Sequence, residues 1–213
     1  MKKYFTVVFS ILFFITSINC FASGLSVNDV LKNLTRHANT VGEFLQEKSV
    51  IVNGKKRLLK SSGTFIISTE GVVWNTLKPV RSVSTITDGQ IILTNSDGRR
   101  SVLDIPANND FSNFSVSFSS IFKGNMENLN NNFNVSYSET SSGEWIISLL
   151  PKKENLSSFM KKIELAGVNL NGDSRLDSVT VFQQNGEDIK YTLTKQIVKE
   201  ILSDEEKYFF EAK

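Results

Sequence analysis

The most regular feature of the sequence is the alternation of apolar and polar residues between short turn signals. Near the C-terminus, Ile189, Tyr191 and Leu193 occupy alternate positions, with polar residues between them. Ile197 continues the apolar series, and Lys195 is its one polar exception. Alternation with a period of two predicts an antiparallel strand that has one mainly apolar face.

Turn signals divide most of the chain into similar runs. Asn-Gly and Asp-Gly pairs tolerate the positive φ angles of tight hairpin turns. They occur at Asn53-Gly54, Asp88-Gly89, Asp97-Gly98, Asn171-Gly172 and Asn185-Gly186. The runs between these and weaker turns are rich in Val, Ile, Thr and aromatic residues, which favours β-structure. Strands are predicted near 43–52, 57–68, 72–77, 80–87, 90–95, 99–103, 132–139, 144–150, 161–167, 175–184 and 187–199.

A helix is predicted to precede the first strand. Ser26 and Asp29 have the spacing of a capping box, with Asp in the position of the usual Glu. The apolar residues that follow at helical spacing are Val27, Val30, Leu31 and Leu34. The helix is expected to end between Ala38 and Gly42, with His37 in its last turn.

The segment from 111 to 130 interrupts the strand pattern. Phe111, Phe114, Phe118, Ile121 and Phe122 lie at helical spacing, although serines between some of them also fit a strand. We predict a helix that ends near 122 and a break at position 124. A second short helix is expected to end at position 130, with two apolar residues facing inward. These are Met126 and Leu129.

The predicted fold is mainly β with some α. A sheet of about eleven antiparallel strands twists, coils and tends to close. We therefore expect a strongly curved sheet. Its concave face should be apolar, with the N-terminal helix and the 111–130 segment as the helices that cover it.

The N-terminal residues read as a secretory leader. Lys2 and Lys3 precede an almost wholly apolar run over 4–18, which is shorter than the roughly 20 residues of a membrane span. A retained anchor helix is the alternative. Small residues at 20 and 22 predict cleavage between Ala22 and Ser23. The expected organisation is thus a signal peptide over 1–22 and a single domain over 23–213.

Cys20 allows a second interpretation of the leader. A lipoprotein signal places a small residue immediately before the cysteine that receives the lipid. Asn19 fits that position poorly, so cleavage after Ala22 is favoured over lipidation of Cys20.

Composition excludes several function classes. Removing the two leader lysines leaves 22 basic and 22 acidic residues, which argues against general nucleic-acid binding. One cysteine and one histidine cannot form a multi-ligand Cys/His zinc site or an intramolecular disulfide. Carboxylates such as Glu43, Glu47, Asp88 and Asp104 show no spacing that singles out a catalytic pair. We expect no catalytic residue, no metal and no cofactor, and therefore no enzymatic activity.

Several motifs follow one another in a familiar order. GEFLQEKSV follows the first helix, and GTFIIS precedes a strand with Trp74 and then Pro79. Further on come SGEWIISLLPKKENL, KKIELAG and a closing hairpin with NGEDIKYTL. This order resembles the LolA-like family of periplasmic carriers of outer-membrane lipoproteins, and it is most similar to the LolA-related branch. The resemblance covers about residues 25–200.

The resemblance implies a half-open barrel with helices over an apolar cavity, located in the periplasm. It also implies a carrier that accepts a lipoprotein from an inner-membrane transporter, shields its acyl chains and passes it to an outer-membrane acceptor. A monomer is expected. A lipid-anchored receptor of the same fold and a periplasmic sensory or regulatory domain are the alternatives. The residues expected to line the lipid cavity are Phe65, Ile67, Trp74, Ile86, Ile92, Phe111, Phe114, Phe118, Phe122, Trp145, Ile147 and Leu149.

The chain departs from the family in one respect. Well-known carriers have an arginine just before the family tryptophan, where it bonds to the lid, and residues 68–73 here contain none. No residue is therefore assigned that lid-locking role. The cargo could be a lipoprotein, a glycolipid or another lipid.

Overall fold

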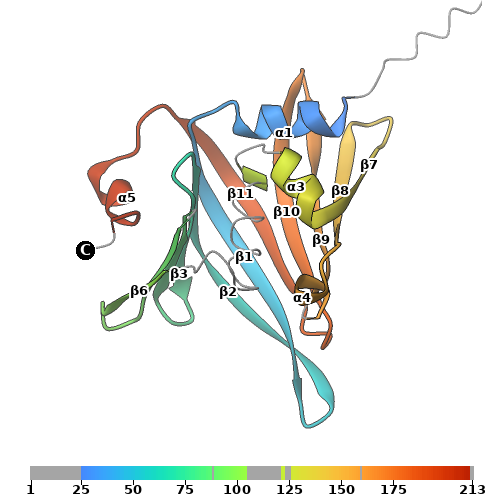
Figure 1. Cartoon of the computed structure of the whole chain (residues 1–213). Helices are drawn as coiled ribbons and strands as arrows, with labels where there is room; N and C mark the ends of the chain where they lie inside the picture. The colour runs from blue at the N-terminus through green and yellow to red at the C-terminus, as the bar shows by residue number, and fades with distance from the viewer. Residues whose placement is uncertain (1–24, 88, 105–120, 123–125, 159, 212–213) are drawn as a thin grey trace, which may run out of the picture.

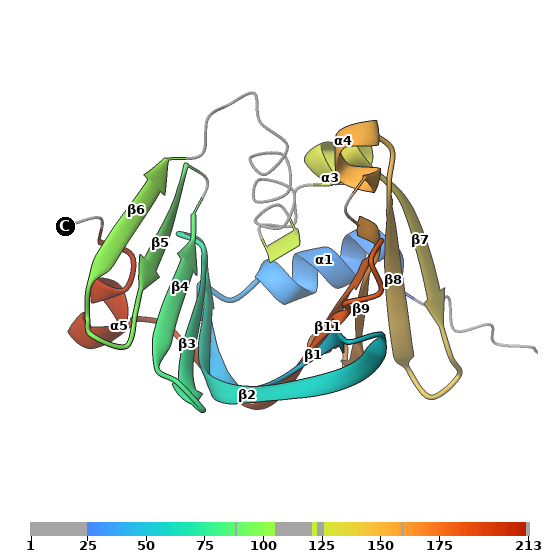
Figure 2. The same cartoon turned by 90° about the horizontal axis from the view of Figure 1, so that it is seen from below.

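The fold is a single curved sheet with helices on its concave side (Figure 1). The computed structural model describes residues 25–87, 89–104, 121–122, 126–158 and 160–211. Eleven antiparallel strands follow the order β6-β5-β4-β3-β2-β1-β11-β10-β9-β8-β7. Neighbours in the sheet are therefore neighbours in the chain, except that β1 pairs with β11. β6 and β7 remain as edges, so the barrel is incomplete, as predicted (Figure 2).

Each strand corresponds to one predicted from the sequence. The bounds are β1 Asn39–Val52, β2 Lys55–Ser68, β3 Val72–Lys78, β4 Ser82–Ile86, β5 Gln90–Thr94, β6 Arg100–Asp104, β7 Phe133–Glu139, β8 Glu144–Pro151, β9 Met160–Leu170, β10 Asp173–Gln183 and β11 Ile189–Lys199. The prediction holds because the turns are chemically specified. At Asn53-Gly54 the φ angles are 51° and 73°, and at Asn171-Gly172 they are 53° and 81°. Two successive positive φ angles are those of a type I′ hairpin turn.

A bulge in β11 changes which residues face the core. The β1–β11 register shifts between Val41 and Glu43, and Lys195 opposite them has a φ of 50°. An extra residue reverses the faces of the residues that follow it. Leu193 is buried, whereas Ile197 is 60% exposed on the outer face. The prediction that Ile197 shares the apolar face of Leu193 is therefore wrong.

Helix α1 (Val27–Thr35) begins as predicted. The Ser26 hydroxyl accepts from the Asp29 N–H, and the Asp29 carboxylate accepts from the Ser26 N–H. Val30 and Leu31 are buried, and the helix packs on β10. The helix ends at Thr35, earlier than predicted, because β1 already begins at Asn39. His37 therefore lies in the connection and not in the last helical turn.

The second helical region is described in part. Residues 121–122 are helical, and α3 (Met126–Asn132) follows with Leu129 buried, two residues longer than predicted. The part of the predicted helix over 111–120 lies outside the described residues. α4 (Glu154–Ser157) and α5 (Asp204–Tyr208) were not predicted. Within the described ranges, no helix has the length and apolar character needed to cross a membrane.

The C-terminal segment covers part of the outer face. Leu202, just before α5, packs with Ile66 of β2 and Val73 of β3 in a second apolar cluster. Arg100 of β6 donates to the Phe209 carbonyl over 3.0 Å. The sheet is thus covered on both sides at β2–β4 (Figure 2).

Candidate functional site

The concave face carries one continuous apolar cluster. Its strands contribute alternate residues, as in β8, where Trp145, Ile147 and Leu149 are all buried. Phe65 of β2 and Trp74 of β3 belong to the same cluster. α1 and α3 close it from the side away from the sheet through residues such as Leu31 and Leu129. We call α1, residues 121–122 and α3 the helical cover.

The remaining residues of the expected cavity fall in different places. Ile67 and Ile86 are partly buried against the cluster, and Phe122 is buried within it. Ile92 is also buried, but it pairs with Thr85, and Thr85 pairs with Val73 of the outer cluster. Ile92 therefore lies on the outer face of the sheet and not on the concave face, where it was expected. Phe111, Phe114 and Phe118 lie outside the described residues. The other described members belong to the packed interior, and Ile67 and Phe122 also border open space beside the helical cover.

That open space consists of two hollows at the rim of the helical cover. Leu34, His37, Ile67 and Phe122 line both of them. Their volumes are about 300 and 210 Å³. Pockets for small-molecule ligands typically measure about 300–1,000 Å³. The two hollows therefore lie at or below the lower end of that range.

Aromatic rings form the floor of the concave face. Trp74 stacks on Tyr191 with ring centroids 4.3 Å apart, and Phe44 meets Trp74 edge-on at 5.2 Å. The Tyr191 hydroxyl accepts from Gln46 over 2.7 Å, and Ser61 donates to the Gln46 carbonyl over 2.6 Å. Burial raises the pKa of Tyr191. The phenol therefore stays neutral and presents an apolar ring to the interior.

Polar contacts fix the end of α1 to the turn between β9 and β10. Arg36 pairs with Asp173 over 2.9 Å, and His37 lies 3.5 Å from the same carboxylate. The Asn33 amide donates to the Gly172 carbonyl and the Ser174 hydroxyl, both over 3.2 Å. These groups are partly exposed, so each contact holds the helix only modestly.

The contacts of Asn33 continue into a chain of side chains along the sheet. Ser174 donates to Asn169 over 2.7 Å, and Asn169 donates to Glu139 over 2.8 Å. Tyr137 donates to Glu139 over 2.8 Å. Burial and the neighbouring carboxylate raise the pKa of Tyr137 to about 12. This network joins α1 to β10, β9 and β7 at one end of the concave face.

Sequence reasoning missed this network. Asp173 and Ser174 follow Asn171-Gly172 and read as turn residues, and Asn33 is one polar position on a helix. Its partners Gly172 and Ser174 lie 139 and 141 residues away in the sequence. The antiparallel register of β9 and β10 brings them to α1, and no local pattern reports that register.

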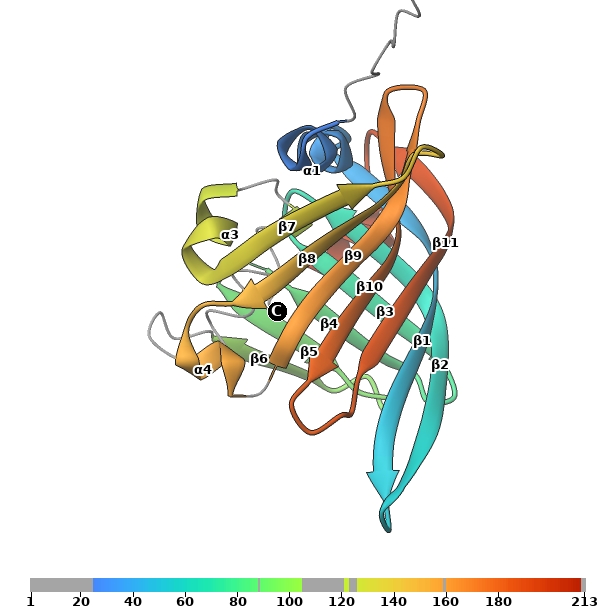
Figure 3. The ribbon, with the colours of Figure 1, turned by 90° about the vertical axis from the view of Figure 1, so that its right-hand side faces the viewer.

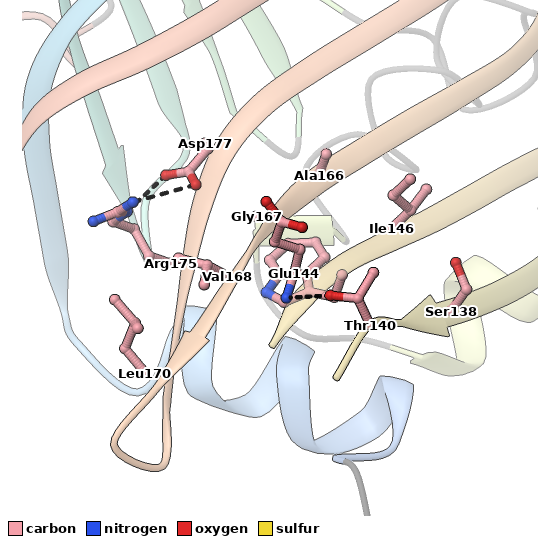
Figure 4. Close-up of a pocket in the computed structure, with 11 residues that line it drawn as sticks. Ser138, Thr140, Glu144, Ile146, Ala166, Gly167, Val168, Leu170, Arg175 and Asp177 are labelled. Atoms are coloured by element: carbon pink, nitrogen blue, oxygen red, sulfur yellow. Dashed lines mark hydrogen bonds and ion pairs between the residues drawn. The ribbon is translucent and has the colours of Figure 1, made fainter. Parts of the chain in front are cut away.

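A larger hollow lies on the other side of the sheet (Figure 4). Its volume is about 630 Å³. Ile146 and Ala166 line it and point away from the buried Trp145 and Ile147 side chains. An Arg175–Asp177 ion pair of 2.6 Å stands at its border. Trp145, one of the residues expected to hold cargo, also lines this hollow, whose other lining residues lie elsewhere than the expected cavity.

Of the four carboxylates considered for catalysis, the two with described side chains each pair with a lysine. Glu43 pairs with Lys195 over 2.9 Å, and Glu47 pairs with Lys60 over 2.8 Å. The side chains of Asp88 and Asp104 lie outside the described set. Among the described residues, no three His, Cys, Asp or Glu side chains gather as metal ligands would.

Comparison with solved structures identifies the architecture. A DUF1329 family protein from Desulfovibrio piger has a TM-score of 0.51 and 9% identity, over 87% of this chain and 95% of that chain. The two proteins share a fold. Also similar are a conserved protein from Thermus thermophilus (TM-score 0.48, 10% identity, 84% and 89% covered) and a LolA superfamily protein from Nitrosomonas europaea (0.44, 8%, 83% and 93%). No family model and no curated protein matches the sequence.

The architecture can also be compared with the one expected from the sequence resemblance. A half-open antiparallel sheet with helices over an apolar concave face is the architecture that this resemblance implied. Agreement extends to the fold and to the apolar character of the concave face. The cargo and its route need a separate argument.

Proposed function

We propose that the protein binds the acyl chains of a lipoprotein or a related lipid between the concave face and the helical cover, and shields them in the periplasm. One observation carries this proposal. In the described part of the chain, short helices cover the apolar concave face, and hollows lie along the boundary between the two at Leu34, Ile67 and Phe122.

The physical requirement for a carrier is a reversible apolar surface. Each methylene of an acyl chain gains about 0.8 kcal/mol on leaving water. An empty carrier that exposed the matching surface would aggregate. A helical cover can meet both requirements if it packs on the concave face when no cargo is bound and moves aside when cargo binds.

The contacts of α1 suit such a cover. Val30 and Leu31 are its fully buried anchors, and the polar contacts at its end are partly exposed. Displacing α1 therefore exchanges two apolar anchors and a few weak polar contacts for acyl chains. The eleven-stranded sheet keeps its own ladder of backbone hydrogen bonds throughout.

The wider role rests on the sequence resemblance. We propose that the leader is removed, that the protein is a soluble monomer without catalytic activity, and that it moves cargo from an inner-membrane donor towards an outer-membrane acceptor. The intact mass of the protein from its native cells tests the first step. A free Ser23 supports the soluble carrier, and a diacylated Cys20 would instead support the anchored receptor.

Binding of a fluorescent fatty-acyl probe to delipidated protein tests the central proposal. Phe122→Ala should retain a folded sheet and lose probe affinity, because Phe122 borders both hollows beside the helical cover and the change buries no charge. Ile147→Asp is the core control and should unfold the protein, because it buries an unpaired charge in the middle of β8. Absence of probe binding by the folded wild type would refute the proposal. Unchanged binding in a folded Phe122→Ala variant would refute the position of the site.

A further inference from the structure

The β1–β2 hairpin projects beyond the rest of the sheet (Figure 3). β1 and β2 pair along their whole length to Val52 and Lys55. The β11 ladder on one side stops at Lys48, and the β3 ladder on the other stops at Ser62. Residues 49–59, here called the hairpin tip, therefore extend past both neighbouring strands.

The hairpin tip exposes large apolar side chains on both of its faces. Directly paired residues share a face, and the register places Leu58 with Ser49 and Leu59 with Lys48. Ile51 and Leu58 point to the outer face and are 50% and 52% exposed. Val52 and Leu59 point to the concave side and are 44% and 55% exposed. Packing against the sheet could cover only one of these faces.

Positive charge surrounds these apolar residues. Lys55, Lys56 and Arg57 are consecutive at the turn, and all three are exposed. The tip and its neighbourhood, residues 47–60 and 187–190, hold six basic and three acidic residues, a net charge of +3. Lys60 is bound to Glu47, whereas Lys56 lies 3.8 Å from Asp188, too far for a hydrogen bond.

We propose that the hairpin tip docks on the surface of an anionic phospholipid bilayer. Apolar residues at the end of the hairpin would enter the interface, and the lysines and arginine would contact the anionic head groups. A bilayer surrounds an inserted tip and so covers both faces, whereas a protein groove receives one apolar face more readily. This contact concerns the membrane and not the cargo, so it goes beyond the proposed carrier function.

Vesicle binding tests the apolar part of the proposal. Protein purified after its own processing is sedimented with vesicles of phosphatidylcholine alone or with 30% phosphatidylglycerol, roughly the range of anionic surfaces in cells. Leu58→Ser/Leu59→Ser should weaken binding to the anionic vesicles by at least about tenfold, given the burial energy of a leucine. Ile197→Ser/Ile201→Ser is the matched control, since both residues are exposed and lie elsewhere. It should bind as the wild type does.

A charge series tests the electrostatic part. Lys55→Gln/Lys56→Gln should weaken binding to anionic vesicles by about tenfold, because each basic residue near the surface contributes to attraction. Lys152→Gln/Lys153→Gln removes the same charge from the exposed connection after β8 and should have little effect. Binding of the wild type should also fall between 0.1 and 0.5 M salt, because the Debye length shortens from about 10 Å.

Either of two results would overturn the proposal. The first is a folded wild type that does not bind anionic vesicles, which would leave a protein partner as the occupant of the tip. The second is a pair of tip variants that bind as tightly as their controls. The acyl-probe assay is run in parallel on every variant. Unchanged probe binding with lost vesicle binding separates failure of the membrane contact from failure of the cargo site.

Discussion

Asn33→Ala tests whether α1 is a cover that opens or an inseparable part of the core. The substitution removes two hydrogen bonds of 3.2 Å, to Gly172 and Ser174. Each contributes about 0.5–1.5 kcal/mol. Alanine returns roughly 0.5 kcal/mol through its higher helix propensity. The net effect is a loss of about 1 kcal/mol from the attachment of α1.

Native-state hydrogen exchange measures this loss where it occurs. If α1 opens locally, its amides should exchange about fivefold faster in Asn33→Ala, since 1 kcal/mol changes an equilibrium by that factor. The amides of β8 and β9 should be unaffected. Lys32→Ala is the control, because Lys32 is an exposed residue on the same helix.

The same experiment can contradict the proposal that α1 opens separately from the sheet. If α1 amides exchange only when those of β8 and β9 do, α1 unfolds with the sheet and cannot yield to cargo on its own. Equal acceleration in Asn33→Ala and Lys32→Ala would show that the contacts to Gly172 and Ser174 do not hold the helix.

Three further substitutions test other parts of the structure. Leu202→Ala should lower the free energy of unfolding in urea by about 2–4 kcal/mol, because it opens a cavity in the outer cluster. Ile201→Ala should cost little, because Ile201 is 75% exposed. Equal effects of the two substitutions would contradict the packing of the C-terminal segment. Gly167→Ala should destabilise the protein by about 1–3 kcal/mol or more. A Cβ at this position would lie 1.9 Å from the Arg175 carbonyl oxygen and 2.4 Å from the Trp145 ring. An unchanged melting temperature would refute that close approach. The pKa of Tyr137 is raised from 10 to about 12, so the folded state holds this proton more tightly and its contribution to stability falls as pH rises from 10 to 12. Tyr137→Phe should flatten that part of the stability-against-pH curve, and an unchanged slope would contradict the assignment.

The sequence was sufficient for the sheet because local chemistry specifies it. Asn53-Gly54 and Asn171-Gly172 can adopt two successive positive φ angles at little cost, and that fixes hairpins and their registers. Alternation then decides which side of β8 is apolar, and Trp145, Ile147 and Leu149, which were expected on the concave face, are all buried there.

The errors arose where distant partners decide the structure. Lys195 adopts a positive φ because β1 and β11 meet there with unequal numbers of residues, and its side chain gives no sign of this. α5 was missed because it is short. Its segment packs on Ile66 and Val73 through Leu202, and that contact depends on where the fold places the C-terminal end of the chain. The contacts of Asn33 were missed for the same reason.

The two proposals place cargo and membrane contacts at opposite ends of one strand. β1 has 14 residues, so the hairpin tip lies about 45 Å from α1, which directly precedes the strand. A bilayer held by the tip is therefore remote from the hollows beside Leu34 and Phe122. Opening of the cover and contact with the membrane are separate events, and each should limit a different rate. Asn33→Ala should accelerate loss of the acyl probe from the protein into buffer, whereas Leu58→Ser/Leu59→Ser should slow its delivery to anionic vesicles and leave its loss into buffer unchanged. Stopped-flow measurement of both rates checks this separation, and a tip variant that alters both equally would show that the two ends act as one site.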